Sequence, residues 1–151
     1  MISEVSLSLM MHQNILVLNL SNNGLSSSAF LSKLPNLTFV NVSNNELEEL
    51  DSISHCVKLE EIVFSHNKIS RVPNLLRMKN LSLIDAAFNL IHSYENVALL
   101  SQSRKLKVIN LTQNPIANKF NYKGVLKKLL PQVLAFDISI TVSSLFMPDH
   151  D

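Results

Sequence analysis

Residues 15–25 read Ile15-Leu16-Val17-Leu18-Asn19-Leu20-Ser21-Asn22-Asn23-Gly24-Leu25, and the chain repeats this pattern four more times. The further copies occupy residues 37–47, 59–69, 81–91 and 106–116. Apolar residues hold the first, fourth, sixth and eleventh places of every copy, and asparagine holds the ninth. Successive copies begin 22, 22, 22 and 25 residues apart. Self-similarity at such a period predicts a solenoid, in which each repeat is stabilised by stacking on its neighbours.

The fourth and sixth places point the same way only where the backbone is extended, because side chains alternate along a strand. Each copy therefore predicts one short strand with two inward apolar side chains. These pairs are Leu18 and Leu20, Val40 and Val42, Ile62 and Phe64, Ile84 and Ala86, and Ile109 and Leu111. The residues between and beside them are expected to form the outer, concave face of a parallel sheet.

The ninth-place asparagines are expected to form a ladder that joins one turn to the next. A side-chain amide both donates and accepts hydrogen bonds, so it can satisfy backbone groups that a turn would otherwise bury unpaired. The five predicted members of this structural ladder are Asn23, Asn45, Asn67, Asn89 and Asn114.

The chain outside these copies predicts a short convex side and a terminal cap. The 22-residue turns leave room only for 3₁₀ or single-turn segments between strands, and the longer fourth turn predicts a short helix opened by Ser93. After residue 116, apolar residues recur at helical spacing up to Pro131, and residues 136–142 alternate as a closing strand would. We expect a partial repeat or edge over residues 1–14, five repeats over 15–116, a helix-strand cap over 117–144 and a tail over 145–151.

The segment that follows the last repeat resembles the C-terminal cap of one subclass of leucine-rich repeat proteins. The resemblance is carried by Asn-Pro-aliphatic at Asn114, Tyr122 followed by Lys123, Leu-Pro at Leu130, and Asp137. It covers roughly residues 15–142 and implies an α/β fold, a right-handed leucine-rich repeat solenoid. Members of this subclass include the repeat-only regulatory subunit of type-1 protein phosphatase and the spliceosomal A-prime protein. The resemblance therefore implies a phosphatase regulatory subunit or a ribonucleoprotein subunit as alternative functions.

The predicted function is a non-enzymatic scaffold that binds a helix or loop of a partner protein on the concave sheet. Apolar residues fall where water would be expected on this face, and a rimmed apolar band favours a binding surface. Phe39, Leu83 and Phe88 are the expected anchors. The predicted partner-binding residues are Val17, Phe39, Asn41, Glu61, Val63, His66, Leu83, Asp85, Phe88, Val108, Asn110 and Gln113. The alternative is that Phe39 and Phe88 pack only on the equivalent side chains of neighbouring repeats or on the tail of the chain.

A second hypothesis places nucleic acid or an acidic partner on the cap. Lys119, Lys123, Lys127 and Lys128 line one face of the predicted cap helix. Such a face binds phosphates in some proteins and is simply solvated in others.

No pattern for chemistry stands out in the sequence. The five histidines and the single Cys56 lack metal-ligand spacing, the two glycines form no phosphate loop, and Ser65-His66 near Asp85 is the nearest approach to a catalytic cluster. We therefore expect no enzyme, no cofactor and no metal. One cysteine permits no internal disulfide, which favours an intracellular protein, cytoplasmic or nuclear and not secreted.

The ends of the chain leave alternatives open. Residues 1–11 lack a basic leader, so a cleaved signal peptide is not expected, and no run of 18 apolar residues predicts a membrane span. The first predicted strand has no obvious cover. Either the chain is cut from a longer one, or its first residues fold over this edge, or the edge mediates self-association.

Overall fold

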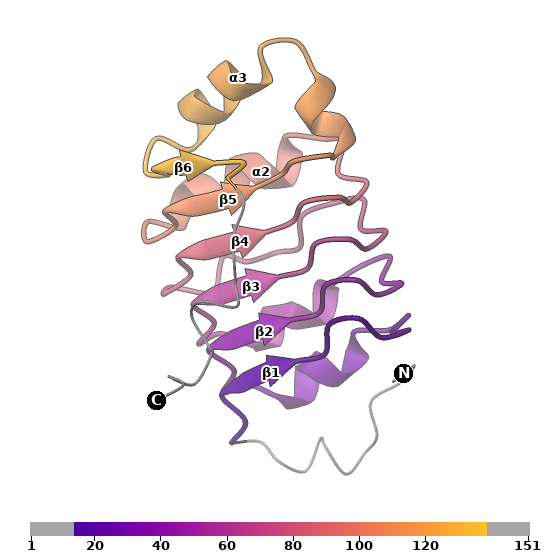
Figure 1. Ribbon diagram of the computed structural model, residues 1–151. Coiled ribbons are helices and arrows are strands. Elements are labelled where there is room, and N and C mark those ends of the chain that lie inside the picture. Colours follow the sequence, from indigo (N-terminus) through magenta and orange to yellow (C-terminus); the bar gives the residue numbers. More distant parts are fainter. Residues whose placement is uncertain (1–13, 139–151) are drawn as a thin grey trace, which may run out of the picture.

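The computed structural model describes residues 14–138, which form a single stack of turns with a six-stranded parallel sheet along one side (Figure 1). The sheet order is β1-β2-β3-β4-β5-β6, so every strand pairs with the one before it in the chain. The strands are β1 (Val17–Asn19), β2 (Phe39–Asn41), β3 (Glu61–Val63), β4 (Leu83–Asp85), β5 (Val108–Asn110) and β6 (Ala135–Phe136).

The pairing keeps one register from end to end. Val17 lies opposite Phe39, Phe39 opposite Glu61, Glu61 opposite Leu83, Leu83 opposite Val108, and Val108 opposite Ala135. Equivalent places of the repeat therefore form straight columns across the sheet. The predicted leucine-rich repeat solenoid with a parallel concave sheet is confirmed.

The return paths behind the sheet contain only short helical segments, as the length of the turns predicts (Figure 1). The 3₁₀ segments are η1 (Ala29–Lys33), η2 (Asp51–His55), η3 (Leu100–Gln102) and η4 (Pro115–Asn118). The longer fourth turn holds the helix α2 (Glu95–Leu99). Ser93 lies one residue further out than predicted, since Tyr94 is the N-cap, but the Ser93 Oγ still accepts the backbone N–H of Glu95 at 3.1 Å.

The cap consists of α3 (Tyr122–Leu129) and β6, which cover the last full turn (Figure 1). The predicted closing strand is shorter than expected within the described residues. It ends at Phe136 because Asp137 adopts a left-handed backbone conformation, with φ at 56°. The part of that prediction that falls on residues 139–142 lies outside the described residues.

The core is a continuous column of aliphatic side chains between the sheet and the convex segments. It includes the inward pairs of every strand, and the Phe64 ring at its centre is completely buried. Cys56 is also fully buried, and its Sγ donates to the backbone carbonyl of Leu31, 3.3 Å away in the preceding turn. Burial raises the pKa of this thiol to about 11.

The asparagine amides hydrogen-bond one turn to the next. The Asn67 Nδ2 donates to the carbonyls of Val42 in the preceding turn and Phe64 in its own turn, at 3.0 and 3.1 Å. The Asn67 Oδ1 accepts the backbone N–H of Leu47 at 3.0 Å. Equivalent bonds are made by Asn45, Asn89 and Asn114. Each amide thus satisfies backbone groups of two turns at once.

Candidate functional site

The predicted partner-binding residues on the concave face fall into three groups according to the exposure of their side chains. The exposed group is Val17, His66, Phe88 and Gln113. The half-buried group is Glu61, Leu83 and Val108. The buried group is Phe39, Asn41, Val63, Asp85 and Asn110. Only the first two groups offer side-chain surface to a partner in this conformation.

The expectation that Phe39 and Val63 are exposed is wrong. Their side chains are only 4% and 3% exposed. Both lie on inner strands, and Phe39 has Val17 and Glu61 at the same level on its two sides, whereas Val17 on the edge strand is 48% exposed.

A column of left-handed residues borders the carboxyl-terminal ends of the strands. The eighth place of every copy has positive φ, at 60°, 55°, 55°, 56° and 58° for Asn22, Asn44, His66, Phe88 and Gln113. Asparagine tolerates this conformation, but it is strained for larger L-residues, in which Cβ approaches the following carbonyl. The backbone therefore turns sharply after each strand and holds the eighth side chain outward.

Two aromatic side chains of this column stack on each other. The His66 and Phe88 rings lie 4.3 Å apart between centroids with an interplanar angle of 10°. Phe88 nevertheless remains 46% exposed, and Leu90, two residues further on, is 51% exposed. The result is a rigid aromatic and aliphatic surface on the fourth turn, at the rim of the concave sheet.

Asp85 lies beneath this surface and is almost fully buried. Its Oδ1 accepts the backbone N–H of Ala87 at 3.2 Å, and burial raises the pKa of its carboxyl against the opposing effects of that bond and of His66. Ser65, His66 and Asp85 do not form a catalytic chain, since no side-chain hydrogen bond joins them in the described part of the molecule, where the His66 ring stacks on Phe88 instead.

The four lysines of the second hypothesis are all exposed. Lys123, Lys127 and Lys128 belong to α3, and Lys119 precedes that helix. The Lys119 ammonium lies 5.1 Å from the centre of the Tyr94 ring, a cation–π contact that fixes it over the convex side. Lys123 instead lines a pocket with Gln113, the next member of the left-handed column after Phe88.

Two surface features are absent from the sequence-based site. One is Leu90, whose tenth place in the repeat is glycine, glutamate, lysine or proline in the other copies and so carries no apolar pattern. Arg104, Lys105 and Lys107 line one polar groove together with Glu60 and Glu61; the Lys105 Nζ donates to the Asn80 Oδ1 at 2.7 Å and the Lys107 Nζ to the carbonyl of Gln132 at 3.5 Å. The closeness of these three basic residues in the sequence could have indicated a basic surface here.

Residues 14–138, the range that the structure describes, hold neither a metal-ligating cluster nor a membrane-spanning helix. No group of three or more metal-ligating side chains comes together there. None of the helices in that range has the length and apolar character needed to cross a membrane.

The constant register, the columns and the asparagine bonds define the class of fold: the chain forms a leucine-rich repeat solenoid. Residues 13–55 match the family model described as Leucine Rich repeats (2 copies). No curated protein matches the chain in sequence.

Solved structures share the fold at low sequence identity. A Leptospira interrogans leucine-rich repeat protein superposes with a TM-score of 0.71 at 22% identity, covering 88% of this chain and 40% of its own. A chain of the Drosophila melanogaster SNF/U2A′ complex gives 0.71 at 24% identity, covering 83% and 74%. An internalin from Listeria monocytogenes gives 0.66 at 14% identity, covering 85% and 42%. The chain thus spans less than half the length of the Leptospira and Listeria proteins.

Proposed function

We propose that this protein is a non-enzymatic scaffold that binds a helix or loop of a partner protein across its concave sheet. Leucine-rich repeat domains act as protein-interaction scaffolds, and the concave surface of a solenoid is the extended surface available for binding. Six strands about 4.8 Å apart give a face roughly 24 Å across, which accommodates a helix about 10 Å in diameter.

The observation that supports this proposal best is the Phe88 side chain. It is 46% exposed, it stacks on His66, and its backbone is held in a conformation that a bulky residue rarely adopts. Exposed aromatic side chains that are held in place are frequent binding hot spots. Phe88 is therefore the proposed central anchor, with Leu90 two residues further on, and Leu83 and Val108 add half-buried apolar surface on β4 and β5.

The experiment compares two exposed phenylalanines. Phe120 is 98% exposed and lies in the cap, away from the concave columns, so Phe120→Ala is a matched control for Phe88→Ala. We expect Phe88→Ala to weaken partner binding by more than about 2 kcal/mol, roughly thirtyfold in Kd, and Phe120→Ala to leave it unchanged.

Affinity purification with quantitative mass spectrometry identifies the partner, and titration of the purified partner gives the affinities. Phe39 is excluded from this comparison because its burial makes Phe39→Ala a change to the packing of the sheet. Equal recovery of the same proteins by both variants would contradict the proposed anchor.

A second candidate is a ribonucleoprotein subunit. The fold neighbour from Drosophila melanogaster was solved as part of the SNF/U2A′ complex, and the exposed lysines of α3 supply a basic surface on this chain. RNA bound through these lysines would lose affinity steeply with salt, with a slope of about −0.7 per phosphate neutralised on a single strand. Binding through Phe88 would respond weakly to salt, so a salt titration of the two variants Phe88→Ala and Lys127→Ala separates the candidates.

Self-association is a third candidate, through the β1 edge. Leu16 and Val17 are 54% and 48% exposed there, and an unpaired strand edge accepts a further strand. Light scattering at increasing protein concentration tests it. We also propose an intracellular location, cytoplasmic or nuclear, because the single cysteine of this sequence permits no internal disulfide.

A further inference from the structure

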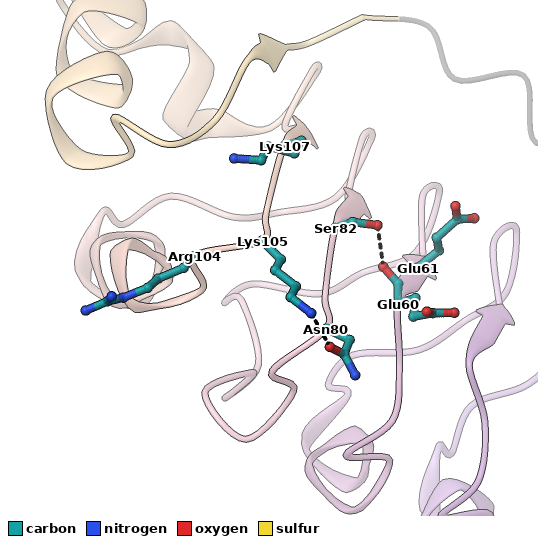
Figure 2. A pocket seen from close by; sticks show the side chains of 7 residues that line it. All are labelled: Glu60, Glu61, Asn80, Ser82, Arg104, Lys105 and Lys107. Atoms are coloured by element: carbon teal, nitrogen blue, oxygen red, sulfur yellow. Dashed lines mark hydrogen bonds between the residues drawn. The ribbon is translucent and has the colours of Figure 1, made fainter.

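A polar groove of about 580 Å³ crosses three consecutive turns at the amino-terminal ends of β3, β4 and β5 (Figure 2). It lies where the chain enters the strands, whereas the Phe88 surface lies where the chain leaves them. The residues that line it are Glu60, Glu61, Asn80, Ser82, Arg104, Lys105 and Lys107.

The groove has opposite charges on its two sides. Glu60 and Glu61 come from the third turn, Arg104, Lys105 and Lys107 come from the fifth, and the neutral residues of the fourth turn lie between them (Figure 2). This middle section is fixed by hydrogen bonds. The Lys105 Nζ donates to the Asn80 Oδ1 at 2.7 Å, and the Ser82 Oγ donates to the carbonyl of Glu60 at 3.1 Å.

The two sides do not neutralise each other. The ion pairs among the described residues join Lys68 to Glu46 and Arg71 to Asp51, and neither pair involves the groove. Burial and the adjacent charge of Glu60 raise the pKa of the Glu61 carboxyl, which is the effect of a carboxylate pair without a nearby counterion. Charges from a ligand would therefore be favourable on both sides.

The separation of the two sides sets the length of a matching ligand. The third and fifth turns are two strand spacings apart, roughly 10 Å, and an extended polypeptide advances about 3.3 Å per residue. Three residues of extended chain therefore span the groove. A continuous polyanion fits poorly, because Glu60 and Glu61 would repel it.

We propose that this groove binds an extended segment of a partner protein that carries acidic and basic side chains about three residues apart. The acidic side chain lies against Arg104, Lys105 and Lys107, and the basic side chain lies against Glu60 and Glu61. This is a second binding surface, separate from the anchor at Phe88. A partner that binds both surfaces would contact the sheet at the amino-terminal ends and at the carboxyl-terminal ends of its strands.

The test uses defined peptides and the full chain labelled with ¹⁵N. The probe is an acetylated and amidated peptide with the core Glu-Glu-Ser-Lys-Lys, compared with all-glutamate, all-lysine and all-serine peptides of the same length. Backbone amide shifts are followed at about 50 mM salt, where screening of exposed charges is moderate. We expect saturable shifts at Asn80, Ser82 and Lys105 with the mixed peptide, and at least tenfold weaker binding of the other three.

Charge exchange provides the decisive comparison. Exchange of both acids, Glu60→Lys together with Glu61→Lys, converts the groove to a wholly basic one, so we expect its preference to move to the all-glutamate peptide. Glu48→Lys, an exposed acid of the second turn outside the groove, should keep the preference of the wild type. The amide spectrum of each variant reports whether the fold is intact.

Two outcomes would overturn the proposal. One is equal affinity of the wild type for the mixed and serine peptides. The other is tighter binding of the all-glutamate peptide or of a short oligonucleotide, which would make the groove an anion site. Either result leaves the Phe88 comparison unaffected, so the two proposals fail independently.

Discussion

The Asp137 carboxylate accepts the backbone N–H of Leu111 at 2.7 Å. In the earlier turns, the equivalent N–H donates to a carbonyl of the next strand, as Phe64 does to Asp85 at 2.8 Å. Asp137 occupies the same place after β6, but its left-handed backbone leads the chain out of the sheet. The Asp137 side chain thus replaces the strand carbonyl as the acceptor of this N–H. The Tyr122 hydroxyl donates to the same carboxylate oxygen at 3.4 Å.

Replacement of Asp137 tests how much this side-chain acceptor contributes to the free energy of unfolding. Asp137→Ala leaves the Leu111 N–H without its acceptor, and we expect the free energy of unfolding to fall by about 1–3 kcal/mol. Asp137→Asn keeps an acceptor oxygen and should lose less than half as much. Urea denaturation measures both, and an alanine variant as stable as the asparagine variant would contradict this assignment.

The asparagine bonds between turns lead to a similar prediction inside the stack. Asn67→Ala removes donors to two turns and the acceptor of Leu47, so we expect a loss of about 1–3 kcal/mol. Asn118, which is exposed in η4, is the matched control, and its alanine variant should change stability by less than about 0.5 kcal/mol. An unchanged denaturation midpoint for Asn67→Ala would contradict the structural role of the amide.

Asp85 should make stability depend on pH. Burial raises its pKa above the ordinary value of about 3.9, so ionisation opposes folding at neutral pH, and this cost disappears as pH falls through the folded-state pKa. Asp85→Asn keeps an oxygen to accept the Ala87 N–H and removes the charge. We expect the variant to be more stable than the wild type at pH 7 and equally stable below pH about 3.5. Lower stability of the variant at pH 7 would show that the charge is stabilising.

Cys56 should react only when the protein unfolds. Its pKa of about 11 and its complete burial leave almost no accessible thiolate at pH 8. We expect labelling by a thiol reagent to follow the rate of global unfolding and to accelerate with urea in step with it. Rapid stoichiometric labelling in native buffer would instead require local opening of the second turn.

Substitutions of Phe88 should separate its effect on stability from its effect on binding. Asparagine tolerates the left-handed backbone and already occupies the equivalent places 22 and 44, so Phe88→Asn should leave stability unchanged or raise it by up to about 1 kcal/mol. Phe88→Val should lower it, because a β-branched residue is strongly disfavoured at positive φ. Thermal denaturation tests this order. Both variants should lose partner binding, which distinguishes a binding residue from a structural one.

The sequence predicted the repeat positions, the inward pairs and the cap, because each follows from a local period or a capping motif. Ser93, the fourth-turn helix and the end of α3 before Pro131 agree with expectation to within about two residues. Phe39 shows why the site was harder to predict. Its place in the repeat is that of a concave residue, yet Phe39 is buried while Leu83 at the equivalent place of β4 is half-buried, so exposure does not follow from the place in the repeat alone.

The left-handed column shows a second limit of sequence reasoning. Asparagine at places 22 and 44 indicates positive φ, but His66, Phe88 and Gln113 carry no such signal, since stacking of identical turns imposes the conformation on whatever residue is present. The groove could not be predicted from local sequence either. Glu60 and Lys107 are distant in the chain, and they line one groove only because the register of three strands aligns their turns.

The single order of the sheet, in which each strand pairs only with its neighbours in the chain, has a consequence for how the molecule opens. Loss of a terminal turn leaves every remaining interface intact, so fraying from the ends costs less than opening the middle. Amide hydrogen exchange should therefore be slowest in β3 and faster toward β1. The Phe88 surface, one strand from this centre, would remain formed while the ends fluctuate.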